Sequence, residues 1–321
     1  MTAAGERDLS VVIATRNRAG LLKETLARLA WQEVGGLGWE VVVVDNGSSD
    51  DTPAVLQAAA AVLPIVALRE PTPGKNRAMN RALDVARGRL LLFTDDDVEP
   101  APGWLAEMVA AAGRWKDHGI FGGPVLLEWP RDTPDWLRAC TTRGANFPLF
   151  VHSQPEGPIA LAPFGPNYAV RRAALAGVRF DESIGPMARA TYAMGSETEL
   201  LLRLMKRGVG AVYVPGSVVH HVIQPAQLEV ASLLKRGFRS GRSAVRLGWD
   251  ADVVRAGRQV LGAPRYLWRM AVEAGARYAL RLPAGRRVSL PAGLRFAYLL
   301  GCLHEYRQRK ALRSQAVPLP S

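Results

Sequence analysis

The stretch Leu90-Leu91-Leu92-Phe93-Thr94-Asp95-Asp96-Asp97 joins a short apolar run to three consecutive carboxylates. A continuous apolar run of this length is typical of a strand that is buried on both faces of a parallel sheet. The carboxylates follow where the strand leaves the core, and open α/β sheets bind ligands at the carboxyl ends of their strands. Adjacent carboxylates repel one another unless a positive charge lies among them. A hard divalent cation shared with a phosphate would supply that charge, and a solvated acidic turn is the alternative.

Apolar patterns on both sides of this stretch predict alternating strands and helices. Short runs of apolar and β-branched residues predict strands at 10–15, 40–45, 65–68 and 90–94. Apolar residues at helical spacing predict helices at 21–31, 52–63, 73–87 and 104–115. This βαβα order favours a Rossmann-like, mostly parallel sheet flanked by helices.

The pattern is less regular in the second half of the chain. Residues 129–166 are rich in Pro, Gly and aromatic residues, and a long aperiodic stretch is more often functional than idle. Helical spacing returns at 199–205, and short apolar runs predict strands at 211–214 and 217–223. From residue 227 to about residue 313 the chain is predicted to be helical and basic.

The positive charge of the chain is concentrated in its C-terminal part. The 321 residues carry a net charge of +12, yet residues 231–321 alone hold 18 Lys and Arg against 4 Asp and Glu. This asymmetry favours a polyanionic partner. Arg mixed with apolar residues between 264 and 313 favours helices that lie on an anionic membrane, and helices that simply pack on the rest of the protein are the alternative.

No apolar run reaches the ~18 residues that a transmembrane helix needs, and the first eight residues are polar. Cys140 and Cys302 lie far apart and form no metal-spaced cluster, which favours a reducing compartment. We therefore expect a cytoplasmic protein, peripheral on the inner face of the membrane if its basic helices bind lipid.

Five motifs resemble, in order and spacing, those of the bacterial-type family 2 glycosyltransferases. The motifs are VIATRNR at 12–18, VVDNGSSD at 43–50, GKNRAMN at 74–80, DDD at 95–97 and GSETEL at 195–200. The resemblance covers roughly residues 9–247 and implies the α/β GT-A fold. It implies a GT-A catalytic domain at 1–225, with a nucleotide-sugar half at about 1–117 and an acceptor half at about 118–225. A basic helical extension would follow at 226–321.

The resemblance implies that the first two motifs bind the nucleoside of a nucleotide-diphospho-sugar. Asp45 ends a predicted strand and would accept hydrogen bonds from the base, with uracil favoured; a turn-initiating Asp is the alternative. Thr15 and Arg16 would line the same corner. Asn17 and Arg18 are weaker candidates, since Asn is also a good helix N-cap.

Lys75 and Arg77 fall at the predicted start of a helix. Free backbone N–H groups at a helix N-terminus favour an anion, and two basic side chains add to that preference. The resemblance places this segment near the nucleotide and its diphosphate. A solvated basic first turn is the alternative.

The resemblance also implies a Mg²⁺ or Mn²⁺ site in the Asp triplet. Asp97 is the preferred direct ligand, Asp95 would contact the ribose or a metal-bound water, and Asp96 would orient the donor sugar. His220 and His221 end a predicted strand, and neutral imidazole is a good metal ligand. Because successive side chains alternate in a strand, at most one of the two can point at the site. We prefer His221.

The resemblance places the catalytic base at Glu197. The family usually has an acidic pair here whose second member is Asp; this chain has Ser196 and the longer Glu197 instead. Glu199 is the fallback, and both Glu residues are expected just before a helix, where an acidic side chain is favourable in any case. Trp129 and Trp136 are weak candidates for contacts with the acceptor.

Together these motifs imply a metal-dependent inverting glycosyltransferase. It would move a sugar, with UDP-sugar as the favoured donor, to a hydroxyl of a saccharide or lipid-linked acceptor in cell-surface polysaccharide or glycolipid synthesis. A nucleotide-sugar-binding protein without transfer activity is the alternative, favoured if Glu197 lies far from the diphosphate pocket. We expect no nucleic-acid partner, because the basic excess is confined to the tail and no recognised motif is present. A dinucleotide oxidoreductase is disfavoured, since the first strand–helix turn lacks the Gly-x-Gly-x-x-Gly fingerprint.

Overall fold

The computed structural model describes residues 7–143, 147–187 and 191–315. The described residues form two compact units. The first unit takes its residues from 1–129, 148–190 and 195–223. The second takes them from 130–147, 191–194 and 224–321, so two short segments within the first 225 residues belong to the unit that holds the C-terminal helices.

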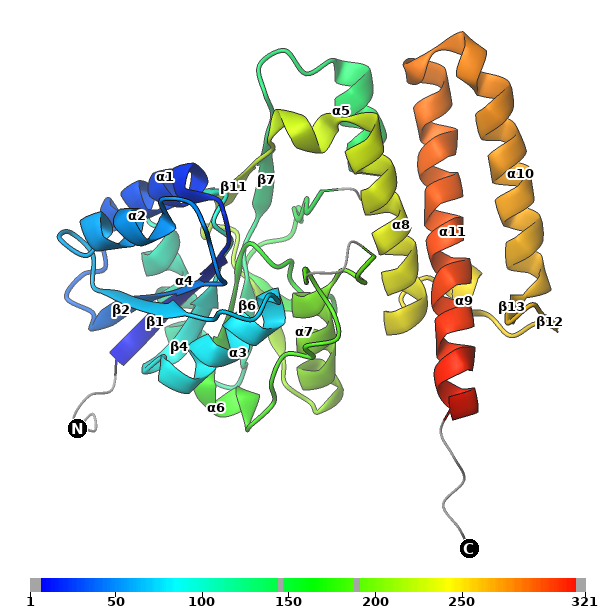
Figure 1. Ribbon diagram of the computed structural model, residues 1–321. Coiled ribbons are helices and arrows are strands. Elements are labelled where there is room, and N and C mark those ends of the chain that lie inside the picture. The colour runs from blue at the N-terminus through cyan, green and yellow to red at the C-terminus, as the bar shows by residue number, and fades with distance from the viewer. Residues whose placement is uncertain (1–6, 144–146, 188–190, 316–321) are drawn as a thin grey trace, which may run out of the picture. The chain divides into compact units, whose positions relative to one another are not determined.

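The first unit is built on an eight-stranded sheet with the order β3-β2-β1-β4-β9-β6-β10-β8 (Figure 1). Its strands are β1 (Arg7–Thr15), β2 (Trp39–Asp45), β3 (Ile65–Arg69), β4 (Gly88–Phe93), β6 (Ile120–Gly122), β8 (Gly157–Ile159), β9 (Tyr168–Arg171) and β10 (Ala211–Tyr213). The first four strands are mutually parallel, as are β6 and β10. Strand β9 runs antiparallel between β4 and β6, and β8 runs antiparallel to β10. The predicted mostly parallel sheet is confirmed.

The first unit also contains a second, three-stranded sheet, and its strand β5 follows β4 and the Asp triplet in the sequence. This sheet has the order β5-β11-β7 and comprises β5 (Val98–Pro100), β7 (Val125–Glu128) and β11 (Val219–Val222). Strand β11 pairs antiparallel with β5, which directly follows the Asp triplet, and parallel with β7. Residues 220 and 221 are therefore brought close to the triplet.

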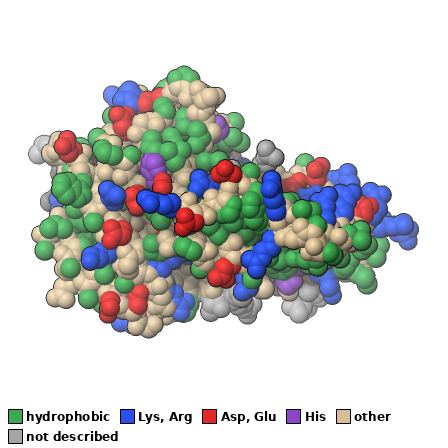
Figure 2. Space-filling model, turned by 90° about the horizontal axis from the view of Figure 1, so that it is seen from above, with side chains coloured by type: hydrophobic (Ala, Val, Ile, Leu, Met, Phe, Trp, Pro, Cys, Tyr) green, Lys and Arg blue, Asp and Glu red, His purple; other side chains and the backbone are tan. Residues whose placement is uncertain are grey.

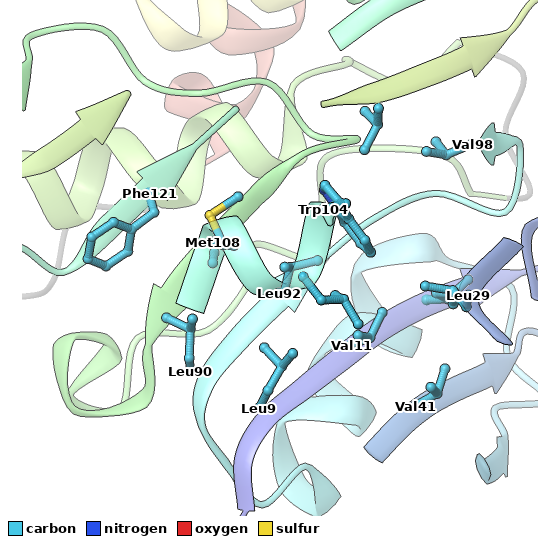
Figure 3. Packing of buried hydrophobic residues seen from close by; sticks show 14 of the residues in the cluster. Leu9, Val11, Leu29, Val41, Leu90, Leu92, Val98, Trp104, Met108 and Phe121 are labelled. Carbon is cyan, nitrogen blue, oxygen red and sulfur yellow. The ribbon is translucent and has the colours of Figure 1, made fainter. Parts of the chain in front are cut away.

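Helices cover both faces of the large sheet. They are α1 (Ala19–Ala30), α2 (Thr52–Ala59), α3 (Lys75–Val85), α4 (Trp104–Arg114), α6 (Arg172–Leu175) and α7 (Ser196–Lys206). On one face, alternate residues of β1, β2 and β4 pack with α1, α2 and α4 around the fully buried Trp104 (Figure 3). On the other face, Val12, Val42 and their neighbours pack with α3, α6 and α7. Burial on both faces explains the uninterrupted apolar runs of these strands.

Three sequence expectations need correction. The stretch 129–166, predicted to be irregular, contains helix α5 (Asp135–Arg143) and strand β8. Helix α3 begins at Lys75 rather than at residue 73, because Asn46 and Pro186 accept hydrogen bonds from the backbone N–H groups of Gly74 and Lys75. Helix α7 begins at Ser196, so the candidate acids lie in its first turn and not before the helix. The short strands β6 and β9 were not predicted, and their places follow from their pairing within the large sheet.

The second unit is mainly helical. Its elements are α5, η1 (Pro225–Leu228), α8 (Val230–Leu247), α9 (Ala251–Val254), β12 (Gln259–Val260), β13 (Ala263–Pro264), α10 (Arg265–Arg281), η2 (Leu282–Ala284) and α11 (Arg286–Gln315). Helices α8 and α11 approach closely, because a Cβ atom on Gly241 would lie 1.8 Å from the Tyr298 carbonyl oxygen and one on Gly301 would lie 1.9 Å from that of Phe238. Among the described helices, none combines the length and the apolar character needed to cross a membrane.

Candidate active site

The candidate residues gather where β1, β2 and β4 end. Parallel strands deliver their carboxyl ends to one edge of the sheet, which brings Thr15, Asp45 and the residues after Phe93 together. The first turns of α3 and α7 add Lys75 and Glu197 to the same place. Figure 2 looks onto this face and shows acidic, basic and histidine side chains next to one another.

Lys75 connects the first Asp of the triplet to the candidate base. Its Nζ lies 2.6 Å from Asp95 Oδ1 and 2.7 Å from Glu197 Oε1. Burial by itself would lower the pKa of Lys75, but the two carboxylates outweigh burial and raise that pKa above its ordinary value. Burial likewise opposes ionisation of Asp95, yet Lys75 holds the pKa of Asp95 below its ordinary value. Lys75 and Asp95 are therefore both charged at neutral pH.

Arg18 plays the same part for the other two carboxylates. Its Nη1 lies 2.7 Å from Asp96 Oδ1 and 2.8 Å from Asp97 Oδ2. The hydroxyl of Thr15 donates a hydrogen bond of 2.7 Å to Asp96 Oδ2. Burial, opposed by Arg18 and reinforced by the charge of Asp97, raises the pKa of Asp96 to about 6. A third sequence candidate of this segment, Asn17, is exposed instead, and its side-chain oxygen accepts a hydrogen bond from the backbone of Ser49.

His221 closes the cluster on the side of the small sheet. Its Nε2 lies 3.4 Å from Asp97 Oδ1, and both side chains are about 5% exposed, 6% for the histidine and 4% for the aspartate. The neighbouring His220 points the other way, half-exposed, with its Nδ1 3.9 Å from Glu128 Oε2. The alternation expected for a strand thus puts His221, and not His220, beside the triplet.

Asp95, Asp97 and His221 can each offer one atom such that all three atoms lie within 4.8 Å of one another. In addition, Asp97 Oδ1 is buried and accepts no hydrogen bond from the residues that the structure describes. A buried carboxylate oxygen without a donor is costly, and a cation would satisfy it. Two carboxylates and one imidazole are a donor set that divalent metals accept. These residues therefore fit a divalent cation.

The formal charges point the same way. Two cations, Lys75 and Arg18, face four carboxylates, namely Asp95, Asp96, Asp97 and Glu197. Counting these six side chains alone, the cluster carries two excess negative charges, and buried charges are unfavourable unless they are paired. One divalent cation balances them.

Asp45 and Asn46 join the motifs at 43–50 and 74–80. Asp45 is buried, and its Oδ1 accepts a hydrogen bond of 2.8 Å from the backbone of Ser48. The side-chain nitrogen of Asn46 donates to the carbonyl groups of Glu70 and Thr72, while its oxygen accepts from the backbone of Gly74. Asn46 thereby fixes the entrance of α3, and hence Lys75, relative to the end of β2.

Other sequence candidates lie apart from this cluster. Arg16 is exposed at the end of β1. Arg77 pairs with Glu182 at 2.9 Å, and Glu199 pairs with Arg203 through two hydrogen bonds of 2.5 and 2.7 Å. The weak acceptor candidates are half-buried; Trp129 directly follows β7 in the first unit, and Trp136 belongs to α5 in the second.

Three residues of the site received little or no weight from the sequence. Arg18 is, like Asn17, only a weaker candidate from the sequence, although the need of three carboxylates for cations is a usable signal. Gly165 lies so close to Glu197 that a Cβ atom there would be 3.0 Å from the carboxyl carbon. The hydroxyl of Tyr168 is buried without a hydrogen-bond partner among the described residues, and burial together with Glu197 and Asp95 raises its pKa well above the ordinary value. The local sequence around Gly165 and Tyr168 contains no pattern that indicates a role in the site.

Comparison with known proteins places this geometry in context. Residues 10–176 match the family model described as "Glycosyl transferase family 2". The succinoglycan biosynthesis protein ExoM of Rhizobium meliloti is 28% identical over 231 residues, which are 70% of this chain and 71% of that protein. Glucosyl-3-phosphoglycerate synthase of Mycolicibacterium smegmatis is 31% identical over 195 residues, 57% of this chain and 62% of that protein.

Two kinds of solved structure resemble the fold. The mannosyltransferase PcManGT from Pyrobaculum calidifontis, in complex with GDP-Man and Mn²⁺, has a TM-score of 0.59 at 20% identity and covers 95% of this chain and 88% of its own. Residues 1–349 of S. aureus TarS, in complex with UDP-GlcNAc, have a TM-score of 0.55 at 14% identity. The match covers 94% of this chain and 92% of the TarS chain.

Proposed function

Since the chain belongs to glycosyl transferase family 2 and has the GT-A fold, we propose that it is a metal-dependent, inverting enzyme that transfers a sugar to an acceptor hydroxyl. Family membership makes it a glycosyltransferase with a nucleotide-sugar donor. The observation that carries the finer proposal is the connected cluster in which Lys75 contacts both Asp95 and Glu197. In this proposal Lys75 lies between a metal ligand, Asp95, and the general base, Glu197, where it can also face the diphosphate of the donor.

The proposed donor is a UDP-sugar whose base is bound by Asp45, with Thr15, Arg16 and Asn17 lining the nucleoside. A buried carboxylate at a strand end can accept the N–H of uracil, and a hydrogen bond to a charged group is worth more than a neutral one. The TarS structure contains UDP-GlcNAc and the PcManGT structure contains GDP-Man, so related folds accept more than one base. The donor test below therefore includes both nucleotides.

Asp97, His221 and Asp95 are the proposed metal ligands, and Asp96 is proposed to orient the donor sugar. When bound, the metal would act as a Lewis acid that stabilises the departing diphosphate. The proposed ion is Mg²⁺ or Mn²⁺, which both suit carboxylate ligands, and we choose Mn²⁺ for the tests. The Mn²⁺ in the PcManGT structure supports this choice. Arg18 and Lys75 place positive charge beside the carboxylates. Arg77, at the start of α3, is proposed to add a further positive charge toward the diphosphate.

Glu197 is the proposed general base. It would take the proton of the acceptor hydroxyl while the oxygen forms a bond to the anomeric carbon and the bond from that carbon to the diphosphate breaks. A single displacement of this kind inverts the anomeric configuration. The contact with Lys75 holds the Glu197 carboxylate beside Asp95, whereas Glu199 is paired with Arg203 one helical turn further along α7.

The alternative is a nucleotide-sugar-binding protein without transfer activity. A Glu197 that lay far from the diphosphate side of the site would favour this alternative. The 2.7 Å contact of Glu197 with Lys75 supports transfer instead.

We further propose a saccharide or lipid-linked acceptor, with Trp129 and Trp136 as contacts, and a role in cell-surface polysaccharide or glycolipid synthesis. The name of the ExoM relative supports the polysaccharide reading. An anionic membrane surface at the inner face of the membrane is a further proposed partner.

A donor screen tests the proposal. The full chain is melted with UDP, GDP and a panel of their sugar conjugates, each with and without Mn²⁺, because a ligand that binds only the folded protein raises its melting temperature. We expect UDP compounds to stabilise the protein strongly only when Mn²⁺ is present. Equal stabilisation with Mn²⁺ and with EDTA would contradict the metal site, and a preference for GDP compounds would contradict uracil recognition by Asp45.

A further inference from the structure

The turn between α10 and α11 forms a continuous stretch of exposed residues. Every residue from 279 to 288 is exposed, and these ten residues are named the hairpin tip. The tip includes the last residues of α10, the short η2 helix and the first residues of α11 (Figure 1). Because α10 and α11 pack along their length, the tip is a defined end of a helical hairpin within the second unit.

Large apolar side chains of the hairpin tip face solvent. Leu280 is 81% exposed, Leu282 is 53% exposed and Val288 is 44% exposed. Val272, two turns earlier on the outward face of α10, is 69% exposed. Single exposed apolar residues are normal on a protein surface, but several on one projecting end mark an interaction site.

The same end is strongly basic. It carries Arg277, Arg281, Arg286 and Arg287, all exposed, and the sequence contains no Asp or Glu between Glu273 and Glu305. Within the described ranges no ion pair reaches any of these four Arg residues. Figure 2 shows blue side chains gathered beside green ones, with a few red ones among them, over the C-terminal helices.

We propose that the hairpin tip docks on a bilayer that contains anionic lipid. Leu280, Leu282 and Val288 would enter the headgroup boundary, while the Arg residues bind lipid phosphates. A bilayer satisfies both kinds of side chain at once. A nucleic acid would neutralise the Arg residues but leave the leucines in water. A second copy joined tip to tip would place Arg against Arg, and like charges repel.

This inference goes beyond the transfer reaction and does not depend on it, because the test needs no substrate. The full chain is sedimented with vesicles of phosphatidylcholine alone and of phosphatidylcholine mixed with phosphatidylglycerol. We expect binding to the mixed vesicles only, weakening as salt rises, since salt screens exposed charges. Binding to both kinds of vesicle equally, or to neither, would overturn the proposal.

Matched variants locate the docking surface. Arg281→Gln, Arg286→Gln and Arg287→Gln combined should weaken binding to the mixed vesicles by roughly 100-fold, since each Arg near an anionic surface contributes about five-fold. The control removes the same charge elsewhere, at the exposed Arg81, Arg87 and Arg207, and should leave binding nearly unchanged. An equal loss in the control would mean that only net charge matters and would overturn the assignment to the tip.

A second pair of substitutions tests the apolar part. Leu280→Ser with Leu282→Ser should weaken vesicle binding by roughly 10-fold or more, because each leucine loses favourable transfer from water. Both positions are exposed, so melting curves should match those of the parent. Unchanged vesicle binding would overturn the proposal. So would concentration-dependent self-association that these substitutions abolish, since that result assigns the tip to a second copy.

Discussion

At the scale of single residues, the site is organised by two cations that each bridge two carboxylates. Arg18 holds Asp96 and Asp97, and Lys75 holds Asp95 and Glu197. Paired and hydrogen-bonded in this way, four carboxylates can lie within one small region without the full penalty of buried charge. The remaining negative charge and the buried oxygen of Asp97 are what a divalent cation would compensate.

Asp97→Asn tests the metal ligand. Asn keeps the size of Asp but lacks the charge, so Mn²⁺ binding and turnover should be lost while the melting temperature in EDTA stays within a few degrees of the parent. Titration of Mn²⁺ followed by electron paramagnetic resonance measures the binding directly. The exposed Asp117→Asn is the control and should bind Mn²⁺ normally. Parent-like Mn²⁺ affinity in the Asp97 variant would remove this residue from the site.

Asp45→Ala tests base recognition. Loss of a hydrogen bond to a charged group should weaken UDP binding by roughly 1.5–3 kcal/mol, which calorimetry measures. Because Asp45 also accepts a hydrogen bond from Ser48, a melting curve must show that the variant is folded. Asp51→Ala, an exposed change beside the same turn, is the matched control. Unchanged UDP affinity in the Asp45 variant would mean that the base binds elsewhere.

At the scale of elements, the strands of the first half could be predicted because burial on both faces leaves an unmistakable apolar run. Strands β1 to β4 and the helices between them lie within a few residues of where the patterns place them, and the mostly parallel sheet with its GT-A assignment is confirmed. The motifs predict that Lys75, Asp95 and Glu197 share one neighbourhood, and their contacts agree with this. Strand β9 and Tyr168 could not be foreseen, because a four-residue strand between two others owes its place to long-range pairing.

The roles of individual side chains were harder to predict than their neighbourhood. The positions of Arg16 and Arg18 follow from where β1 ends and α1 begins, and a shift of one residue turns a side chain from the cluster to solvent. Glu199 pairs with Arg203 one helical turn along α7, which is a local contact; what the local pattern does not contain is the start of this helix at Ser196, which puts Glu197 in its first turn. Such registers depend on tertiary contacts that no local pattern contains.

Close packing of α8 against α11 yields a prediction about stability. A methyl group on Gly241 would lie 1.8 Å from the Tyr298 carbonyl oxygen, so Gly241→Ala must push the helices apart. Overpacking of this kind costs typically 1–3 kcal/mol, which urea unfolding measures. Gly113→Ala is the control, because that helical glycine is exposed with nothing within 4 Å of an added Cβ, and it should stabilise slightly. Equal stability of both variants would contradict the close approach.

At the scale of the whole molecule, chemistry and charge are divided between the two units. The carboxylates, Lys75 and His221 belong to the first unit, whereas the excess of Arg lies in the helices of the second. The proposed division of labour is transfer in the first unit and docking on an anionic surface by the hairpin tip in the second. Each part can fail independently, because vesicle binding requires no donor and donor binding requires no vesicle.

The central claim is that Glu197 is the base of a glycosyl transfer, and Glu197→Gln tests it most directly. Gln keeps the shape and hydrogen bonding of Glu but cannot take a proton. With the donor identified by the melting screen, kcat should fall on the order of 10²-fold or more while calorimetric UDP affinity stays nearly unchanged. Glu199→Gln, in the same helical turn, should retain most of the activity. Full activity of the Glu197 variant, or loss of activity in the Glu199 variant alone, would contradict the account.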